Sequence, residues 1–397
     1  MVSCAALWTR DHAADAAAGR PRIIAELHAG ALRDVRHVRL HHALELGWGA
    51  RLAAAIRWLW RLTTFRPEPL QCALYAVPAE VRLAADAVGD AATVYIDGVR
   101  CLATVRLLAR PDRRLVCDLD DLLSRRARLQ IAVGEPPNLG YVARYAPRPL
   151  TWLLGKAGGL VQRYEAWSLR RAECELAGLC DEVVLLSPVE CAAYRAYLPA
   201  GLQTRIRRVP PAQAVARPGA GLATPLRFIF VGGENLSQNR LTLLRLFRLW
   251  AKAPPGRELH WFGRREPNGI VPPPGVVCHG FVPDLAAAAY DGRSVLLNPS
   301  ALAGGVKTKM LEALAHGCPA VGNQAALEGM DWPDYPLLIG DDDAVWSQLI
   351  ADPESRLEDL RRGLAVGQER LRREHDPLMF ERSWRGLLHL DPPAARG

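Results

Sequence analysis

Residues 304–321 read GGVKTKMLEALAHGCPAV, and our interpretation of the chain starts from this stretch. Two glycines lead into a helix-forming run with two lysines and one acid, and a glycine and a proline end that run before an apolar strand. A helix start prefers acidic side chains, so Lys307 and Lys309 are unfavourable there unless an anion is bound. Glu312 follows on the same face, where it could accept hydrogen bonds from sugar hydroxyls beside a phosphate. The stretch predicts a sugar-diphosphate site; the alternative is an exposed helix with a Lys–Glu surface pair.

Length and charge limit the possible classes. A chain of 397 residues favours two domains, and a hydrophobic content of 50% allows a sizeable core. Lys and Arg exceed Asp and Glu by 50 − 42 = 8. This excess suits phosphate-bearing ligands or weak attraction to an anionic membrane surface. Nucleic acid is disfavoured as a partner because no arginine- and aromatic-rich binding motif is visible.

Cysteine usage and hydropathy indicate the compartment. The nine cysteines are scattered and form no C-x-x-C pair, which favours free thiols in a reducing cytosol over disulfides or zinc. The start, MVSCAALWTR, lacks a basic region and predicts a buried strand rather than a signal peptide. No apolar run is long enough to predict a transmembrane span. We expect a cytoplasmic protein, with peripheral contact at the cytoplasmic face of the inner membrane as an open alternative.

The stretch LAAAIRWLWRL at residues 52–62 predicts an amphipathic helix. Its tryptophans could touch a membrane, although a role in the core or between domains is favoured.

Short apolar runs alternate with helical patterns in both halves of the chain, which predicts parallel sheets with crossover helices. The expected strands are Val2–Trp8, Val35–Leu40, Ala92–Ile96, Leu115–Leu119, Glu182–Leu186, Leu226–Val231, Glu258–Phe262, Gly275–Val277, Ser294–Asn298 and Ala320–Gly322. The expected helices include Leu160–Leu176, Arg240–Trp250, Asp284–Tyr290, Lys307–Ala315 and residues 355–393. We expect an N-terminal domain over 1–210, a Pro- and Gly-rich linker over 211–225, a second domain over 226–376, and a C-terminal helix over 377–397 that packs back on the first domain.

Open parallel sheets bind ligands at the carboxyl ends of their strands, so the loops after strands are the candidate sites. One such loop holds Gly232, Gly233 and Asn235, after a strand and before a helix. Glycines there let the backbone approach a phosphate, and the helix N-terminus favours the anion. A tight turn with no ligand is the alternative for this loop taken alone.

The segment VLLNPSALAGGVKTKMLEALAHGCPAVGNQAALEGM resembles the donor-site segment of GT-B glycosyltransferases, particularly the family 4 group of retaining enzymes. FIFVGGENLSQN is similar to the first strand and glycine loop of the same domain, and VCHGFVPDLAAAAYDGRSVLLNPS to a following strand-and-helix segment. In the first half, VYIDGVR, VCDLDDLLSRR and RRAECELAGLCDEVVLLSPVE resemble acceptor-domain elements. The resemblance implies an α/β fold of GT-B type, with two Rossmann-like doubly wound domains facing a cleft.

Roles follow from the resemblance residue by residue. It implies that Glu312, the second glutamate of the family's E-x7-E motif, grips the nucleotide ribose, and that the two lysines hold the diphosphate. Gly232 and Gly233 match the family's glycine loop, and we expect Asn235, Gly304, Gly305 and Thr308 to bind the donor as well. There are two departures: Gly304 replaces the first glutamate of the motif, and Glu234 with Asn235 stands where the family often has an Arg…Lys pair.

The run Asp118–Asp121 (DLDD) follows an apolar strand, so it lies at a strand's carboxyl end. We expect Asp120 and Asp121 to orient an acceptor hydroxyl or take its proton, with Lys309 as the third catalytic residue. A D-x-D metal site and a simple N-cap for the next helix remain alternatives. The further acceptor-side candidates are Asp97, Arg100, Asp118, Ser124 and Arg125.

The sequence thus predicts a glycosyltransferase that moves a sugar from a nucleotide-activated donor to a glycan or lipid-linked acceptor in bacterial surface polysaccharide biosynthesis. The resemblance implies retention of the anomeric configuration. The nucleotide sugar is a substrate, so no cofactor is expected, and the lysines make a divalent metal unnecessary. A nucleotide-sugar epimerase of the same fold and a non-catalytic relative acting as a scaffold remain open.

Overall fold

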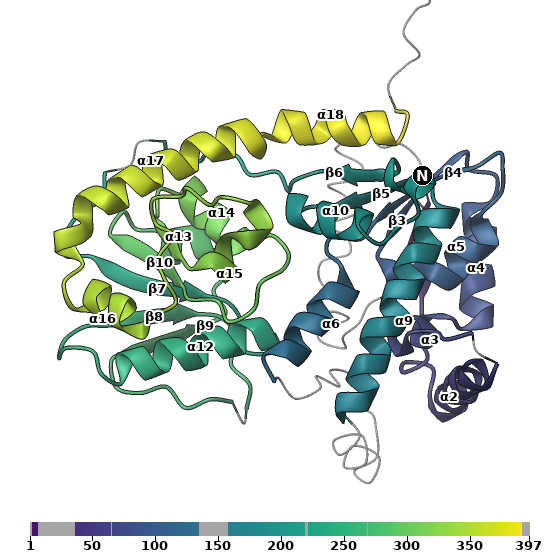
Figure 1. The fold of residues 1–397 in the computed structure, drawn as a ribbon, viewed down its shortest axis with the longest axis horizontal. Coiled ribbons are helices and arrows are strands. Elements are labelled where there is room, and N and C mark those ends of the chain that lie inside the picture. The colour runs from purple at the N-terminus through teal and green to yellow at the C-terminus, as the bar shows by residue number, and fades with distance from the viewer. Residues whose placement is uncertain are drawn as a thin grey trace, which may run out of the picture. The chain divides into compact units, whose positions relative to one another are not determined.

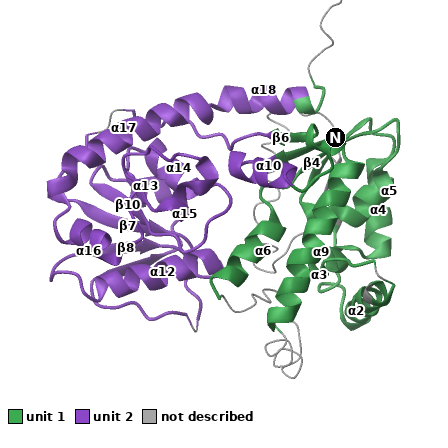
Figure 2. Ribbon diagram, in the orientation of Figure 1, with its two compact units in different colours: residues 1–184, 197–207, 387–397 green, residues 185–196, 208–386 purple. Residues whose placement is uncertain are grey.

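The structure, a computed structural model, describes residues 2–6, 36–64, 66–134, 158–218, 221–267 and 269–390. The chain divides into two compact units (Figure 2). Unit 1 comprises residues 1–184, 197–207 and 387–397, and unit 2 comprises residues 185–196 and 208–386. The expected strand ends at Trp8 and Val35, linker residues 219–220 and residues 391–397 lie outside the described residues.

Unit 2 is built on a five-stranded sheet in the order β11-β10-β7-β8-β9, in which every neighbouring pair is parallel (Figure 1). Its strands are β7 (Arg227–Val231), β8 (Leu259–Phe262), β9 (Val276–Gly280), β10 (Ser294–Asn298) and β11 (Ala320–Gly322). The chain runs outward from β7 through β8 to β9 and then returns to place β10 on the other side of β7. This reversal creates a switch point between β7 and β10, where doubly wound sheets bind their ligands.

Helices cover both faces of this sheet, with α12 and α16 along one side and α14 and α17 along the other (Figure 1). The helices of unit 2 are α10 (Pro188–Arg195), α12 (Ser237–Trp250), α13 (Leu285–Ala289), α14 (Thr308–Ala315), α15 (Gln324–Leu327), α16 (Asp343–Ala351) and α17 (Leu357–Glu374), with 3-10 turns η2 (Glu328–Met330) and η3 (Glu354–Arg356). The helix α18 (Pro377–Leu387) also belongs to unit 2 as far as Gly386.

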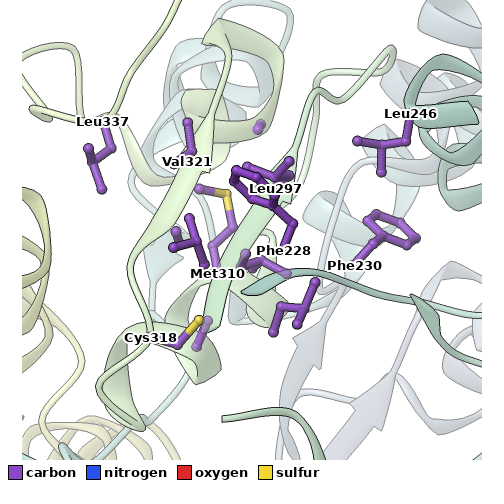
Figure 3. Packing of buried hydrophobic residues seen from close by; sticks show 14 of the residues in the cluster. Phe228, Phe230, Leu246, Leu297, Met310, Cys318, Val321 and Leu337 are labelled. Carbon is purple, nitrogen blue, oxygen red and sulfur yellow. The ribbon is translucent and has the colours of Figure 1, made fainter. Parts of the chain in front are cut away.

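The core of unit 2 fills the space between sheet and helices (Figure 3). All five residues of β10 are buried, as expected for a continuous apolar run covered on both faces. Phe228 and Phe230 of β7 lie in the same core as Met310 of α14 and Val321 of β11. Burial of each such side chain contributes about 1.5–3 kcal/mol, so this packing fixes the strand ends that carry the loops described below.

Unit 1 contains a four-stranded sheet in the order β3-β4-β5-β6, with β3 parallel to β4 and β4 parallel to β5. Its strands are β3 (Thr93–Asp97), β4 (Arg114–Asp118), β5 (Glu182–Leu185) and β6 (Ile206–Arg208). A separate parallel pair is formed by β1 (Val2–Ala6) and β2 (Arg36–Leu40). The helices are α2 (Trp48–Thr63), α3 (Leu70–Tyr75), α4 (Pro78–Val88), α5 (Leu102–Leu108), α6 (Leu123–Ala132), α9 (Gly158–Leu179) and α11 (Ala200–Gln203), with the 3-10 turn η1 (Val99–Cys101).

The structure differs from the expected organisation in three places. The helix α10 groups with unit 2 although it precedes the expected linker. The expected linker is part of unit 2, where the N–H groups of Ala216 and Arg217 both donate hydrogen bonds to the Ala315 carbonyl. The helix expected over 355–393 is broken after Glu374, and Pro377 opens α18, a position where proline's missing N–H has no cost. That the C-terminal helix packs on the first domain stays a prediction.

The predicted amphipathic helix exists as α2, and Trp58 packs against Tyr164, but several of its other large apolar side chains are exposed. Leu52, Ile56 and Trp60 are 62%, 57% and 67% exposed. Spaced four residues apart, they form one exposed apolar face, which also includes Trp48 at 68% exposure. Among the residues described, no helix combines the length and apolarity needed to cross a bilayer.

Candidate active site

Two glycine-containing loops lie at the switch point of the unit 2 sheet, one after β7 and one after β10. In the first, a Cβ on Gly232 would come within 2.7–2.9 Å of the Asn239 side chain, and Gly232 has a φ of 152° that larger residues rarely adopt. A Cβ on Gly233 would lie 2.6 Å from Oδ1 of Asn235. Glycine is therefore required at position 232 for this loop to pass close to α12, whereas a side chain at position 233 would only displace the exposed Asn235 side chain.

Lys309 joins the two loops. Its Nζ donates to Oδ1 of Asn239 on α12 at 2.6 Å, and it lies 4.4 Å from the ring centroid of Phe230. Burial, aided by repulsion from Lys307, lowers the pKa of Lys309 to about 7. The protein thus disfavours the charged form of Lys309, and an anionic ligand would relieve this cost.

The second loop is shaped by left-handed glycines and one distant carboxylate. Gly304 and Gly305 have φ values of 92° and 63°. Lys307 is almost fully buried, and its Nζ donates to the Gly304 carbonyl at 2.7 Å. The Gly304 N–H donates to Oε2 of Glu328 at 2.8 Å. Glu328 lies 24 residues further along the chain, so sequence reasoning missed it, and no local pattern indicated it.

Glu312 lies on α14 beyond the lysines and is half-buried. Burial raises the pKa of its carboxyl group, although His316 acts in the opposite direction. Within the part of the chain that the structure describes, no hydrogen bond engages this carboxylate. Its acceptor capacity is therefore available for a ligand hydroxyl. Thr308, which opens the helix, is exposed.

The two residues that replace the family's Arg…Lys pair behave differently from each other. Asn235 is exposed beside the glycine loop. Glu234 is buried, and its carboxylate accepts from the backbone N–H groups of Glu266 and Ile270 at 3.3 and 2.5 Å. Glu234 therefore holds the loop after β8 in place.

In unit 1, the parallel pairing of β3 with β4 sets Asp97 beside Asp118 at the same edge of the sheet. The Tyr95 hydroxyl donates to Oδ2 of Asp118 at 3.0 Å, and the Asp120 N–H donates to Oδ1 at 3.1 Å. Asp120 is exposed and left-handed, with a φ of 57°. Desolvation, together with repulsion from Asp118, Asp97 and Asp121, raises the pKa of Asp120 to about 6.

Asp121 and Arg100 have partners within unit 1. Asp121 is buried and pairs with Arg126. Arg100 donates to the Gln71 side chain at 3.1 Å, and Arg125 is half-buried. Among the described residues, no group of three or more His, Cys, Asp or Glu side chains is arranged to hold a metal ion.

Ser124 is fully buried and its hydroxyl is bonded to Glu173, so an acceptor-side role for it stays a prediction. The Ser124 hydroxyl and N–H donate to the two carboxylate oxygens of Glu173 at 2.5 and 3.0 Å, and the Tyr197 hydroxyl adds a third bond. Burial raises the pKa of Glu173 to about 7 despite these bonds. The carboxylate thus caps the first turn of α6, directly after the DLDD loop.

The family described as glycosyl transferases group 1 matches residues 225–349, which contain both glycine loops and the lysine helix. No curated protein sequence matches the chain. The chain is therefore a glycosyltransferase with the GT-B fold, as the resemblance implied, and its assignment to the family 4 group stays a prediction.

The fold of this chain is also similar to solved structures that cover most of its length. HepE of Anabaena in complex with UDP is similar with a TM-score of 0.56 and 12% identity, over 90% of this chain and 92% of that chain. Sucrose-phosphate synthase of Thermosynechococcus elongatus is similar with a TM-score of 0.57 and 15% identity, over 79% of each chain. The apo form of the lipopolysaccharide outer core galactosyltransferase WaaB has a TM-score of 0.52 and 12% identity, over 90% of this chain and 85% of that chain.

Proposed function

We propose that unit 2 binds a nucleotide-activated sugar and that the enzyme transfers the sugar to a hydroxyl of a glycan or lipid-linked acceptor. The observation that carries this proposal is the Lys309–Asn239 hydrogen bond at the switch point. It brings a half-buried lysine of the first turn of α14 to the helix that follows the glycine loop of β7. A diphosphate is the ligand class that a cation and glycine-lined backbone at a helix start select.

In this proposal, the lysines stabilise the leaving nucleoside diphosphate. Negative charge grows on the diphosphate as the glycosidic bond breaks, and Lys307, Lys309 and the N-terminus of α14 would meet that charge without reorganisation. Glu312 would accept hydrogen bonds from the ribose hydroxyls. HepE, which has been solved with UDP and with UDP-glucose, supports a uridine nucleotide as the first donor to test.

Asp120 is our candidate for the acceptor side. With a pKa of about 6, it would be mostly ionised at pH 7 and yet basic enough to orient an acceptor hydroxyl or take its proton. Asp97, Asp118 and Asp121 would set this basicity through their charges. Arg100 and Arg125 remain candidates for contact with an acceptor.

The finer parts of the proposal each have a separate source of support. Retention of configuration is carried by the family resemblance, and metal independence by the lysines of the donor loop. A role in bacterial surface polysaccharide biosynthesis is supported by the similarity to WaaB, a lipopolysaccharide galactosyltransferase.

Cytoplasmic location with peripheral contact to the inner membrane is supported by α2. Its exposed face carries tryptophans, and the helix contains three arginines and no acidic residue. Such a face suits an anionic lipid surface.

The test is calorimetric titration of UDP and UDP-sugars into the wild-type chain and Lys309→Gln, followed by transfer assays with each donor that binds. We expect micromolar binding that the substitution weakens. Incubation with the donor alone distinguishes the alternatives: isomerisation of the sugar would indicate an epimerase, and tight binding with no transfer to any acceptor would indicate a scaffold. No binding of any nucleotide sugar would refute the donor site.

A further inference from the structure

We propose that unit 1 contains a second anion site, a pocket of four arginines that binds a phosphate ester. The pocket lies between the end of α2, the segment that leads into α3, and the helices α5 and α9. It encloses about 510 Å³ and is lined by Arg61, Arg66, Arg106, Arg171, Glu175 and Leu102. This volume is in the range of small-molecule sites and exceeds what an inorganic phosphate needs.

Two of the four arginines are held by acids. Nε of Arg61 lies 3.1 Å from the carboxylate of the buried Glu68. Arg106 pairs with Glu175 through two bonds of 2.6 and 2.8 Å and also lies 3.4 Å from Glu68. These contacts fix both guanidinium groups against the wall of the pocket.

The other two arginines are not needed for that network. Arg66 and Arg171 are exposed, and neither forms an ion pair with any residue that the structure describes. The Arg171 guanidinium lies 5.2 Å from the ring centroid of Trp167, a contact that orients it without neutralising it. Four arginines against Glu68 and Glu175 leave the pocket with a net charge of 4 − 2 = +2.

This charge and geometry select a phosphate ester. Guanidinium groups recognise phosphate through paired hydrogen bonds, and a dianion matches two uncompensated arginines better than a carboxylate does. The organic group that is esterified to the phosphate would occupy the part of the pocket that the phosphate itself does not fill. Two sources share this chemistry, a soluble phosphate ester and the headgroup of a phospholipid.

The site goes beyond the proposed transfer reaction. All of its lining residues belong to unit 1, whereas the lysine loop belongs to unit 2, and it uses none of the carboxylates of the DLDD loop. Its occupation can therefore be tested without reference to the donor.

The experiment measures binding of glycerol 3-phosphate by calorimetry to the full chain at low salt. We expect Arg66→Gln and Arg171→Gln each to weaken binding about tenfold, the effect of one lost charged hydrogen bond. Glu175→Gln should tighten binding, because it releases Arg106 and raises the net charge. If Glu175 and Arg106 only stabilised the fold, Glu175→Gln would not increase the affinity for glycerol 3-phosphate. The matched control is Arg163→Gln. Arg163 is an exposed arginine of α9, the helix that also carries Arg171, but it does not line the pocket.

The source of the phosphate is tested by flotation with vesicles of phosphatidylcholine, with and without phosphatidic acid. Recruitment that requires phosphatidic acid and is lost in Arg66→Gln/Arg171→Gln supports the proposal with a lipid source. Calorimetric binding without such recruitment supports it with a soluble source. Binding that is equal in the wild type and the double variant, or absent in both assays, overturns it.

Discussion

The loop after β10 in unit 2 and the loop after β4 in unit 1 occupy equivalent places, each at the carboxyl end of a parallel strand, but carry opposite charge. In the first, burial and Lys307 lower the pKa of Lys309 to about 7. In the second, desolvation and three neighbouring aspartates raise the pKa of Asp120 to about 6. In each loop, therefore, neighbouring groups of the same charge repel one another. We propose that an anion relieves the repulsion in the first loop and that a proton relieves it in the second.

The largest effect that we predict is for Asp120→Asn, which keeps the shape of the side chain and removes its basicity. Transfer should fall about 10²- to 10⁴-fold, the range for a lost general base, while UDP affinity stays unchanged. Because the raised pKa means that the folded chain disfavours the charged carboxylate, the same variant should melt at a higher temperature at pH 7. Transfer rates, calorimetry and thermal unfolding check the three expectations.

Treatment with EDTA tests the metal alternative for the same loop. We expect no loss of wild-type activity. Complete inhibition that manganese reverses would show that Asp118–Asp121 bind a metal ion. The repulsion among these aspartates would then be relieved by the metal rather than by a proton.

The next effect concerns Lys307→Gln with Lys309→Gln. Turnover should fall about 10²- to 10³-fold, as for other lost donors to a developing anion, whereas UDP affinity should fall less. The reason is that the charge on the diphosphate grows during transfer. Steady-state kinetics and UDP titration give both values, and equal losses in the two would mean that the lysines only bind.

Glu312→Ala should weaken donor binding by about 1–3 kcal/mol, the cost of a lost charged hydrogen bond. The control is 2′,3′-dideoxy-UDP, which lacks the hydroxyls that Glu312 is proposed to bind. Calorimetry should show no difference between wild type and variant for this ligand. A loss of the same size for both ligands would assign Glu312 to something other than the ribose.

A smaller effect should appear in the pH dependence of UDP affinity. A bound diphosphate raises the pKa of Lys309 from about 7, so binding takes up a proton above that pH. Affinity should be flat below pH 7 and then fall by up to about tenfold per unit as pH rises, until the pKa of the bound form is reached. Titrations between pH 6 and 9 measure this slope. Lys309→Arg, which stays charged, should abolish it, and a slope that persists in this variant would assign the proton to another group.

The smallest effect on transfer is expected for Ser124→Ala. Removal of this buried hydroxyl should cost about 1–2 kcal/mol of unfolding free energy, because Glu173 loses a hydrogen bond. Donor affinity and the rate constant for transfer should stay the same. Denaturant unfolding and kinetics check this, and a large loss of transfer in a stable variant would return Ser124 to the acceptor side.

The second half of the chain could be predicted well because its strands are short, continuous apolar runs. Ser294–Asn298 and Ala320–Gly322 are strands with the expected bounds, and α14 begins one residue after the expected start. In unit 1, the three-residue β6 was missed because its sequence, IRR, has no apolar pattern of its own. Its place in the sheet depends on pairing with residues distant in the sequence.

The amino-acid sequence alone was enough to predict the strands of the second half and to propose an anion site in the loop after β10, because glycines, lysines and a carboxylate follow one another there at helical spacing. The contacts between residues that are distant in the sequence became visible in the tertiary structure alone. It joined Lys309 to Asn239 across 70 residues, brought Glu328 to the Gly304 N–H, and buried Ser124 against Glu173. It also gathered arginines from α2, α5 and α9 into one pocket. Local spacing sets periodicity and charge along one element, whereas contacts between elements depend on sheet order and packing, which a linear pattern does not encode.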